Sequence, residues 1–176
     1  MDSTRRTLLA GVAGAGVVGG GAWVAANGLP GATPRTTVET VDARGSTAGE
    51  RTVPVPGEPT LVDLFATWCA PCKGQMSSLA SLHREFGDRV AFVSVTNERF
   101  GNGFTREYLR EWWRRFGGNW TLGVDPESEL HEALGAGGIP YLVVADADGR
   151  IVWRHGGLAR EAAIRRAIED ALSGNR

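Results

Sequence analysis

The stretch LVDLFATWCAPCK, residues 61–73, decides how this sequence folds. Its first half belongs to a short apolar run, residues 60–66, which predicts a buried β-strand. Its second half holds the only two cysteines of the chain, Cys69 and Cys72, with Trp68 before them and Lys73 after them. Apolar residues then recur at steps of three and four as far as Phe86, which predicts an amphipathic helix. The cysteine pair therefore lies where a strand is followed by a helix.

The spacing of the two cysteines indicates reversible thiol–disulfide chemistry. If Cys72 lies one helical turn after Cys69, the two thiols can close a disulfide with little movement of the chain. The unpaired N–H groups and the dipole at a helix N-terminus favour the thiolate, which is the nucleophilic form of cysteine. Pro71 suits the first helical turn, because its missing N–H costs nothing there.

Two other interpretations of the pair fit less well. A structural zinc site uses four protein ligands, but the sequence has no second cysteine pair, and its three histidines are scattered. A purely structural disulfide is the other possibility, and it would close so small a loop that it removes little entropy from the unfolded chain. We therefore expect a redox-active pair without a metal.

The segment around the cysteines resembles the active-site strand and helix start of the thioredoxin superfamily. A second match lies downstream, where Gly138-Ile139-Pro140 precedes the apolar run of residues 141–145. In that family the corresponding proline is cis and faces the active-site disulfide. The resemblance implies a thioredoxin-like α/β fold, with a central mixed sheet flanked by helices.

The resemblance also implies a role for each residue of the site. Cys69 is expected to be the exposed nucleophile that attacks a substrate disulfide, and Cys72 to resolve the mixed disulfide. Asp63 matches a buried acid of thioredoxins; its pKa should be raised, so that it could carry the proton of Cys72. A solvent-facing aspartate at a strand end is the alternative, and strand alternation alone does not decide between the two. The residues expected on the substrate-binding side are Trp68, Ala70, Pro71, Ile139 and Pro140.

An insertion narrows the resemblance to one branch of the superfamily. More than fifty residues separate Phe86 from Pro140, roughly twice what a minimal thioredoxin needs. They predict a strand at 89–95, a helix at 105–116 with Thr105 as its N-cap, a strand at 120–124 and a short helix at 127–134. This resembles TlpA and ResA, extracytoplasmic thiol–disulfide oxidoreductases that are often tethered to the membrane. Gln75 departs from the glutamate that ResA-like proteins carry, so we expect proton transfer through Asp63 or water.

The N-terminal residues predict export. Residues 3–9, STRRTLL, resemble a twin-arginine signal, and the chain carries no charge from Leu8 to Pro34. We therefore assign residues 1–27 to a signal or membrane anchor, residues 28–36 to a linker, and residues 37–174 to a thioredoxin-like domain that begins with a β-hairpin at 37–54. Whether the first segment is cleaved stays open.

The remaining sequence features do not indicate a catalytic or cofactor site. Residues 14–19 fit the pattern G-x-G-x-x-G but lie in the signal-like segment and not in a βαβ unit, so we expect no nucleotide cofactor. A formal net charge of −1 argues against a nucleic-acid partner. Residues 146–149 resemble the start of a calcium loop but are better interpreted as a hairpin turn. Trp112 and Trp113 are adjacent within a charged helix, so one of them could be exposed as part of a docking surface.

The sequence thus predicts a monomeric thiol–disulfide oxidoreductase that acts outside the cytoplasm. By resemblance to TlpA and ResA, it would reduce disulfides of partner proteins and receive electrons from a membrane carrier. Two alternatives are a peroxidase of the same superfamily and a thioredoxin-fold binding module without activity. The peroxidase pattern Pro-x-x-x-Thr-x-x-Cys has no match here, and the intact cysteine pair argues against a module that only binds.

Overall fold

The computed structural model describes residues 35–101 and 103–174. The expected signal or anchor at residues 1–27 lies outside the described residues, as does most of the expected linker at 28–36. Thr36 already belongs to the first strand, so the folded region begins slightly earlier than predicted. Within the described part of the chain, none of the helices is long and apolar enough to cross a membrane.

One mixed β-sheet forms the centre of the molecule. Its seven strands lie side by side in the order β2-β1-β5-β4-β3-β6-β7. The parallel pairs are β3 with β4 and β4 with β5, whereas all other neighbours are antiparallel. The strands are β1 (Thr36–Thr40), β2 (Gly49–Val53), β3 (Thr60–Phe65), β4 (Ala91–Thr96), β5 (Thr121–Val124), β6 (Tyr141–Ala145) and β7 (Ile151–Gly156).

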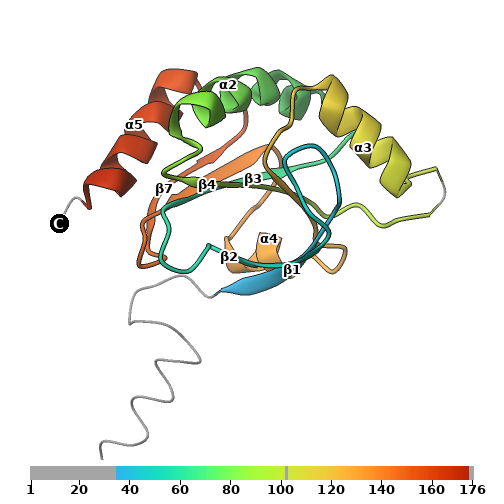
Figure 1. Ribbon diagram of the computed structural model, residues 1–176, viewed down its shortest axis with the longest axis horizontal. Helices are drawn as coiled ribbons and strands as arrows, with labels where there is room; N and C mark the ends of the chain where they lie inside the picture. Colours follow the sequence, from blue (N-terminus) through green and yellow to red (C-terminus); the bar gives the residue numbers. More distant parts are fainter. Residues whose placement is uncertain (1–34, 102, 175–176) are drawn as a thin grey trace, which may run out of the picture.

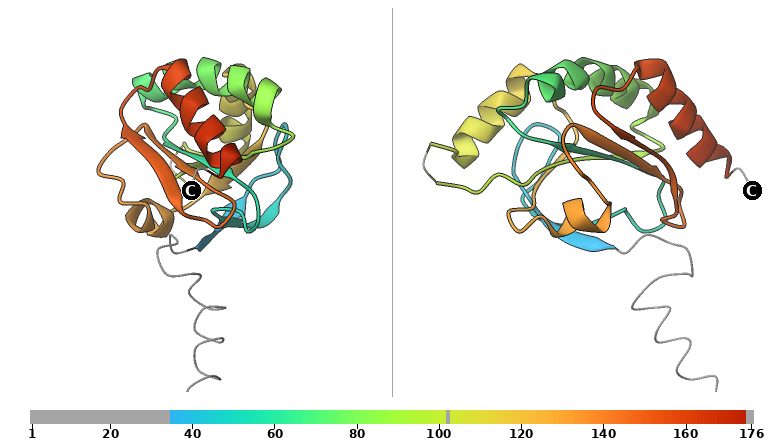
Figure 2. Two further views of the ribbon diagram at one scale, coloured as in Figure 1. Left: turned by 90° about the vertical axis from the view of Figure 1, so that its left-hand side faces the viewer. Right: turned by 180° about the vertical axis from the view of Figure 1, so that it is seen from behind.

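Helices cover both faces of this sheet, as the sequence predicted. Figures 1 and 2 show α2, α3 and α5 along one face and α4 on the other, close to the hairpin of β1 and β2. The two faces hold separate apolar clusters, one with residues of α2, α3 and α5 and the other with residues of α4. The helices are α2 (Ala70–Phe86), α3 (Arg106–Arg115), α4 (Glu129–Ala133) and α5 (Glu161–Ser173).

Strand β3 leads into the segment with the two cysteines and is buried along its whole length. Its side chains alternate between the two apolar clusters, as a strand requires. Leu61 and Phe65 join the cluster beneath α2, while Val62 and Leu64 join the opposite one. Asp63 has the same strand parity as Leu61 and Phe65, so its carboxyl group faces the α2 side.

The predicted turns and caps are present. The hairpin of β1 and β2 is antiparallel over residues 36–53, and Thr105 caps α3 by accepting a hydrogen bond from the N–H of Tyr108 at 3.1 Å. Between β6 and β7, the Asp146 carboxylate accepts the backbone N–H groups of Asp148 and Arg150. That side chain closes the turn, which confirms the hairpin interpretation of residues 146–149.

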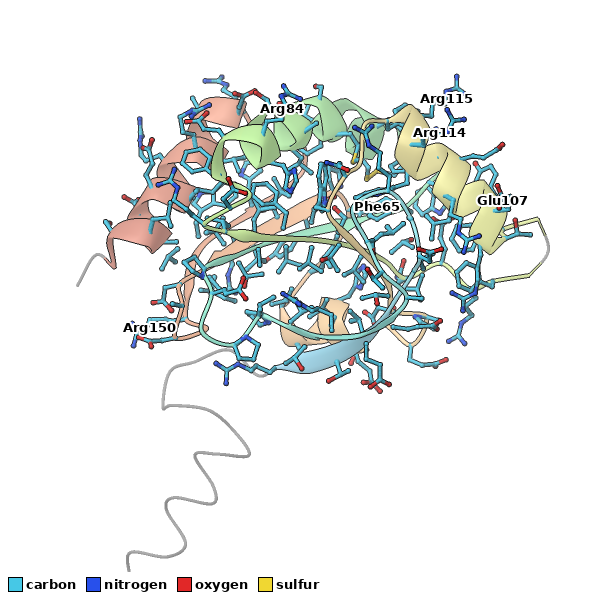
Figure 3. The ribbon with its side chains drawn as sticks, in the orientation of Figure 1. Phe65, Arg84, Glu107, Arg114, Arg115 and Arg150 are labelled. Carbon is cyan, nitrogen blue, oxygen red and sulfur yellow. A yellow bond between two sulfur atoms is a disulfide. The ribbon has the colours of Figure 1, made fainter. Side chains whose placement is uncertain are left out.

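Our expectation that Trp112 or Trp113 could be exposed is wrong, because both are buried. Trp112 stacks on Phe65 with ring centroids 5.0 Å apart, and the position of Phe65 is labelled in Figure 3. Trp113 lies edge-on to Trp120 at 4.9 Å and donates its indole N–H to the carbonyl of Arg44 at 2.9 Å. Helix α3 is contacted from two sides, by the sheet and by the loop before β2. The side chains of Trp112 and Trp113 are therefore both buried although they are adjacent in sequence.

Candidate active site

The cysteine pair lies at the junction of β3 and α2. Cys69 is the N-cap residue of α2, and Pro71 occupies its first turn. Cys69 and Cys72 form a disulfide, with their Cα atoms 5.3 Å apart. The backbone N–H of Cys72 points at the sulfur of Cys69, 3.2 Å away. After reduction, this N–H group and the helix dipole would stabilise a negative charge on that sulfur.

The exposure of the two cysteines differs less than we expected. In the disulfide, Cys69 is 4% exposed and Cys72 is 1% exposed, so the description of Cys69 as openly exposed is wrong for this state. The adjacent residues supply the accessible surface instead. Trp68 is 69% exposed, and Ala70 and Pro71 are exposed as well. These three residues form an accessible rim next to the buried sulfur of Cys69.

The loop before the cysteines is held by a carboxylate that our sequence analysis missed. Glu98 accepts hydrogen bonds from the backbone N–H of Thr67 at 2.7 Å and from its hydroxyl group at 2.8 Å. The carbonyl of Thr67 accepts the indole N–H of Trp112 at 3.1 Å. All polar groups of Thr67 are therefore fixed, two residues before Cys69.

A sequence signal for Glu98 existed. Glu98 lies two positions after the end of β4, and β4 runs parallel to β3, the strand that leads to the cysteines. The carboxyl ends of parallel neighbouring strands meet at one edge of the sheet, which is where ligand and active sites of α/β folds lie. A charged residue shortly after β4 is thus a candidate for contact with the residues shortly after β3.

Asp63 is a buried carboxyl group on the α2 side of the sheet. It is 1% exposed, and one of its oxygens accepts the Ser94 hydroxyl at 2.8 Å. Its other oxygen has no hydrogen-bond partner among the described residues. Burial raises the pKa of Asp63 to about 7, and the hydrogen bond from Ser94 opposes that rise. The solvent-facing alternative is therefore excluded.

Gln75 has a structural partner of its own. Its side-chain oxygen accepts the N–H of Ala159 at 2.8 Å, and its amide group donates to the carbonyl of Ala159 at 3.3 Å. This buried pair of hydrogen bonds attaches α2 to the segment that precedes α5. Both ends of the amide make a hydrogen bond in that contact, and an uncharged amide does not act as an acid or base near neutral pH.

The loop before β6 brings the second predicted motif to the site. The peptide bond between Ile139 and Pro140 is cis, as the resemblance implied. The structure also has a cis bond between Val53 and Pro54, which we did not predict. A cavity of about 330 Å³ has both Trp68 and Ile139 in its lining. Two segments seventy residues apart in sequence therefore meet beside the disulfide.

The comparisons with known proteins agree with this geometry. The model of the Redoxin family matches residues 31–170, most of the chain. The chain belongs to the Redoxin family. That match includes the cysteine pair, the insertion with α3 and the cis-proline loop.

Two curated relatives carry the same descriptive name. The thiol:disulfide interchange protein HelX of Rhodobacter capsulatus is 29% identical over 67% of this chain and 63% of its own length. The thiol:disulfide interchange protein CycY of Rhizobium leguminosarum is 26% identical over 74% of this chain and 70% of its own length. The match thus leaves about a third of each relative uncovered.

Solved structures confirm the predicted fold. The exposed lipoprotein thioredoxin Etrx1 of Streptococcus pneumoniae matches 77% of this chain and 98% of its own chain, with a TM-score of 0.63 and 20% identity. At that identity, the likeness concerns the fold. The fold of this protein is therefore thioredoxin-like, as the residues around the cysteines implied.

Proposed function

We propose that this protein is a thiol–disulfide oxidoreductase that reduces disulfides of partner proteins through Cys69 and Cys72. The observation that carries the proposal is the position of the Cys69–Cys72 disulfide at the N-terminus of α2, next to a cavity lined by Trp68 and the cis-proline loop. The names of HelX and CycY, both thiol:disulfide interchange proteins, support it.

The reaction begins with the reduced pair. The thiolate of Cys69 attacks one sulfur of the partner's disulfide, a mixed disulfide forms, and the other partner sulfur leaves as a thiolate and takes up a proton. Cys72 then loses its proton and attacks the sulfur of Cys69. This step reforms the Cys69–Cys72 disulfide and releases the second partner thiol. One disulfide is reduced and one dithiol is oxidised, so atoms and electrons balance.

The division of work between the cysteines follows from their surroundings. Cys69 has the N–H donor that stabilises a sulfur anion and lies next to the exposed Trp68. Cys72 lies deeper, over the face of β3 that carries Asp63. A carboxyl group with a pKa of about 7 is suited to accept the proton of Cys72 near neutral pH. We assign Asp63 this role, and water completes the transfer to solvent.

The partner chain would bind across the rim of the disulfide. Trp68, Ala70 and Pro71 offer exposed surface on one side. Ile139 lines the cavity on the other side and Pro140 next to it is buried; an extended segment of the partner would pair with the backbone before β6. The product disulfide must be reduced again by an external dithiol, and we expect a membrane-bound electron carrier to supply it. We further propose that the protein acts outside the cytoplasm, with residues 1–27 as a signal or tether. We also propose that it is a monomer.

Trapping of partner proteins tests this function directly. With Cys72→Ala, Cys69 should hold partners as mixed disulfides that run as larger species on non-reducing gels and disappear on reduction. The matched control is Cys69→Ala, which keeps one thiol but should trap none. Wild-type protein should reduce insulin disulfides, and both variants should lose that activity. Trapping through Cys72 in the Cys69→Ala variant, or no insulin reduction by the wild type, would contradict the proposal.

A further inference from the structure

A second cavity lies beside the redox centre, on the side of the inserted helix α3. Its volume is about 610 Å³, and it opens between the C-terminal end of α3 and the first turn of α2. Figures 1 and 2 show these two helix ends next to each other. The residues that line the cavity are Lys73, Tyr108, Glu111, Trp112, Arg114, Arg115 and Phe116. We call this cavity the α3 groove.

The α3 groove carries a net positive charge. Its lining holds three cationic side chains and one acidic side chain, although the chain as a whole has a formal net charge of −1. Within residues 35–101 and 103–174, no carboxylate lies within 4 Å of the charged groups of Lys73, Arg114 or Arg115. These three cations are therefore available to an anionic partner.

The rest of α3 shows that this is not a general property of the helix. Its earlier arginines have carboxylate partners in the protein: Arg106 pairs with Glu39, and Arg110 pairs with Asp42 and Glu107. The unpaired cations are confined to the end that faces α2. Figure 3 labels Arg114 and Arg115 at this end, with Glu107 at the opposite end of the helix.

The floor of the α3 groove is aromatic and is attached to the active-site loop. Tyr108 is 45% exposed, and the guanidinium group of Arg115 lies 5.7 Å from the centre of the Phe116 ring. Trp112 donates its indole N–H to the carbonyl of Thr67, two residues before Cys69. On the other wall, Lys73 follows Cys72 directly in sequence. A chain bound in the groove would therefore lie next to the disulfide.

We propose that the α3 groove binds an acidic segment of the partner protein, located a few residues from the cysteine that Cys69 attacks. The proposal rests on the thiol–disulfide function and specifies which partners this protein prefers. Carboxylates of the partner would contact Lys73, Arg114 and Arg115, while its apolar groups pack on Tyr108 and Phe116. Because Lys73 in the groove wall follows Cys72 directly, acidic residues close in sequence to the reacting cysteine would reach the groove.

The experiment compares three disulfide-linked peptides that differ only in the residues flanking one cysteine: Glu/Asp, Ser or Lys/Arg. The measurement is kcat/KM for their reduction, at low and at high salt. Each exposed charge pair contributes modestly, and salt weakens it. For wild-type protein, we expect the acidic peptide to react about five- to tenfold faster than the basic one at low ionic strength, with the ratio near one in 1 M salt.

Two groups of variants connect that preference to the groove. Combining Arg114→Gln with Arg115→Gln should bring the ratio of acidic to basic peptide below about twofold, and combining Arg114→Glu with Arg115→Glu should reverse it. The matched control is Arg84→Gln, an exposed arginine eleven positions beyond Lys73 on α2 (Figure 3). It should keep the wild-type ratio. Thermal unfolding of each variant verifies that it is folded.

The outcomes separate this proposal from the function on which it rests. If wild-type protein reduces none of the three peptides, the thiol–disulfide function itself fails. If it reduces all three at equal rates, the function stands and the α3 groove has no part in partner choice. A preference for the acidic peptide that survives charge reversal at Arg114 and Arg115 would also overturn the proposal, because the preference would then come from another surface.

Discussion

Among residues 35–101 and 103–174, two carboxyl groups are buried, and their surroundings differ sharply. Asp63, on β3, accepts a single hydrogen bond from Ser94 and has an oxygen without a partner among the described residues. Asp125, directly after β5, accepts the N–H groups of three residues in the first turn of α4 and the ring N–H of His131 at 2.8 Å. Both side chains are shielded from water, but only Asp125 has enough hydrogen-bond donors to replace the lost contacts with water.

The difference teaches that burial by itself does not assign a role to a carboxyl group. Asp125 lies before a helix, and its oxygens accept the backbone N–H groups of the first turn. It has the environment of a structural cap. Asp63 lacks such compensation, so burial raises its pKa to about 7. A group that is costly to ionise and close to neutral in pKa is suited to move a proton.

The largest expected effect is on the pH dependence of stability. The folded-state pKa of Asp63 is about 7 and its ordinary value is 3.8, so the folded protein keeps a proton that the unfolded chain releases between these values. Stability should fall as pH rises through this window, by roughly 4 kcal/mol for a shift of about three pH units. Asp63→Asn should remove this slope and be more stable than wild type at pH 8. Urea unfolding of both proteins at pH 4 and pH 8 measures this change in the free energy of unfolding. The same pH dependence in Asp63→Asn as in wild type would contradict the raised pKa of Asp63.

Removal of the Asp125 carboxyl group should lower the free energy of unfolding, whereas removal of the Asp63 carboxyl group should raise it at pH 8. Asp125→Ala removes the acceptor of three backbone N–H groups and the partner of His131. A lost cap costs about 1 kcal/mol and an orphaned buried donor roughly 1–3 kcal/mol, so we expect a loss of about 3 kcal/mol in the free energy of unfolding. Asp125→Asn, which keeps one acceptor oxygen, is the control and should lose less. If Asp125→Ala had the same free energy of unfolding as wild type, Asp125 would not be a structural cap.

The activity of Asp63→Asn tests the role of the carboxyl group in proton transfer. Without a group that titrates near pH 7, the rate of insulin reduction at pH 7 should fall about tenfold. The inflection of the pH–rate profile near pH 7 should disappear. Asp125→Asn serves as the reference, because its carboxyl group caps a helix and should leave the profile in place. An unchanged rate and profile in Asp63→Asn would remove Asp63 from the mechanism.

The smallest expected effect concerns Ser128, the N-cap residue of α4. Ser128 has a left-handed backbone with φ of 61° and makes no capping hydrogen bond, since Asp125 satisfies the first turn. Ser128→Gly would relieve the backbone strain but lose the hydrogen bond from Asn97, so the two effects oppose each other. We expect the free energy of unfolding to change by less than about 1 kcal/mol. A loss as large as that of Asp125→Ala would show that Ser128 shares the cap.

Much of the fold could be predicted because its signals are local. The apolar run at 60–66, the helical periodicity after Cys72 and the Thr105 cap depend on neighbours within a few positions. Contacts across the sheet were harder to predict. Glu98 holds Thr67 although 31 residues separate them, and both Trp112 and Trp113 are buried because α3 is covered from two sides.

The sequence by itself determined the cysteine pair and its place between a strand and a helix, because spacing and periodicity are local signals, while the proline loop was implied by the family resemblance. Only the tertiary structure decided the state of Asp63, since its pKa depends on burial and on a donor from β4. Tertiary packing also gathered Lys73, Arg114 and Arg115 at one groove. Solvation and charge proximity are properties of the assembled fold, and no short segment of sequence contains them.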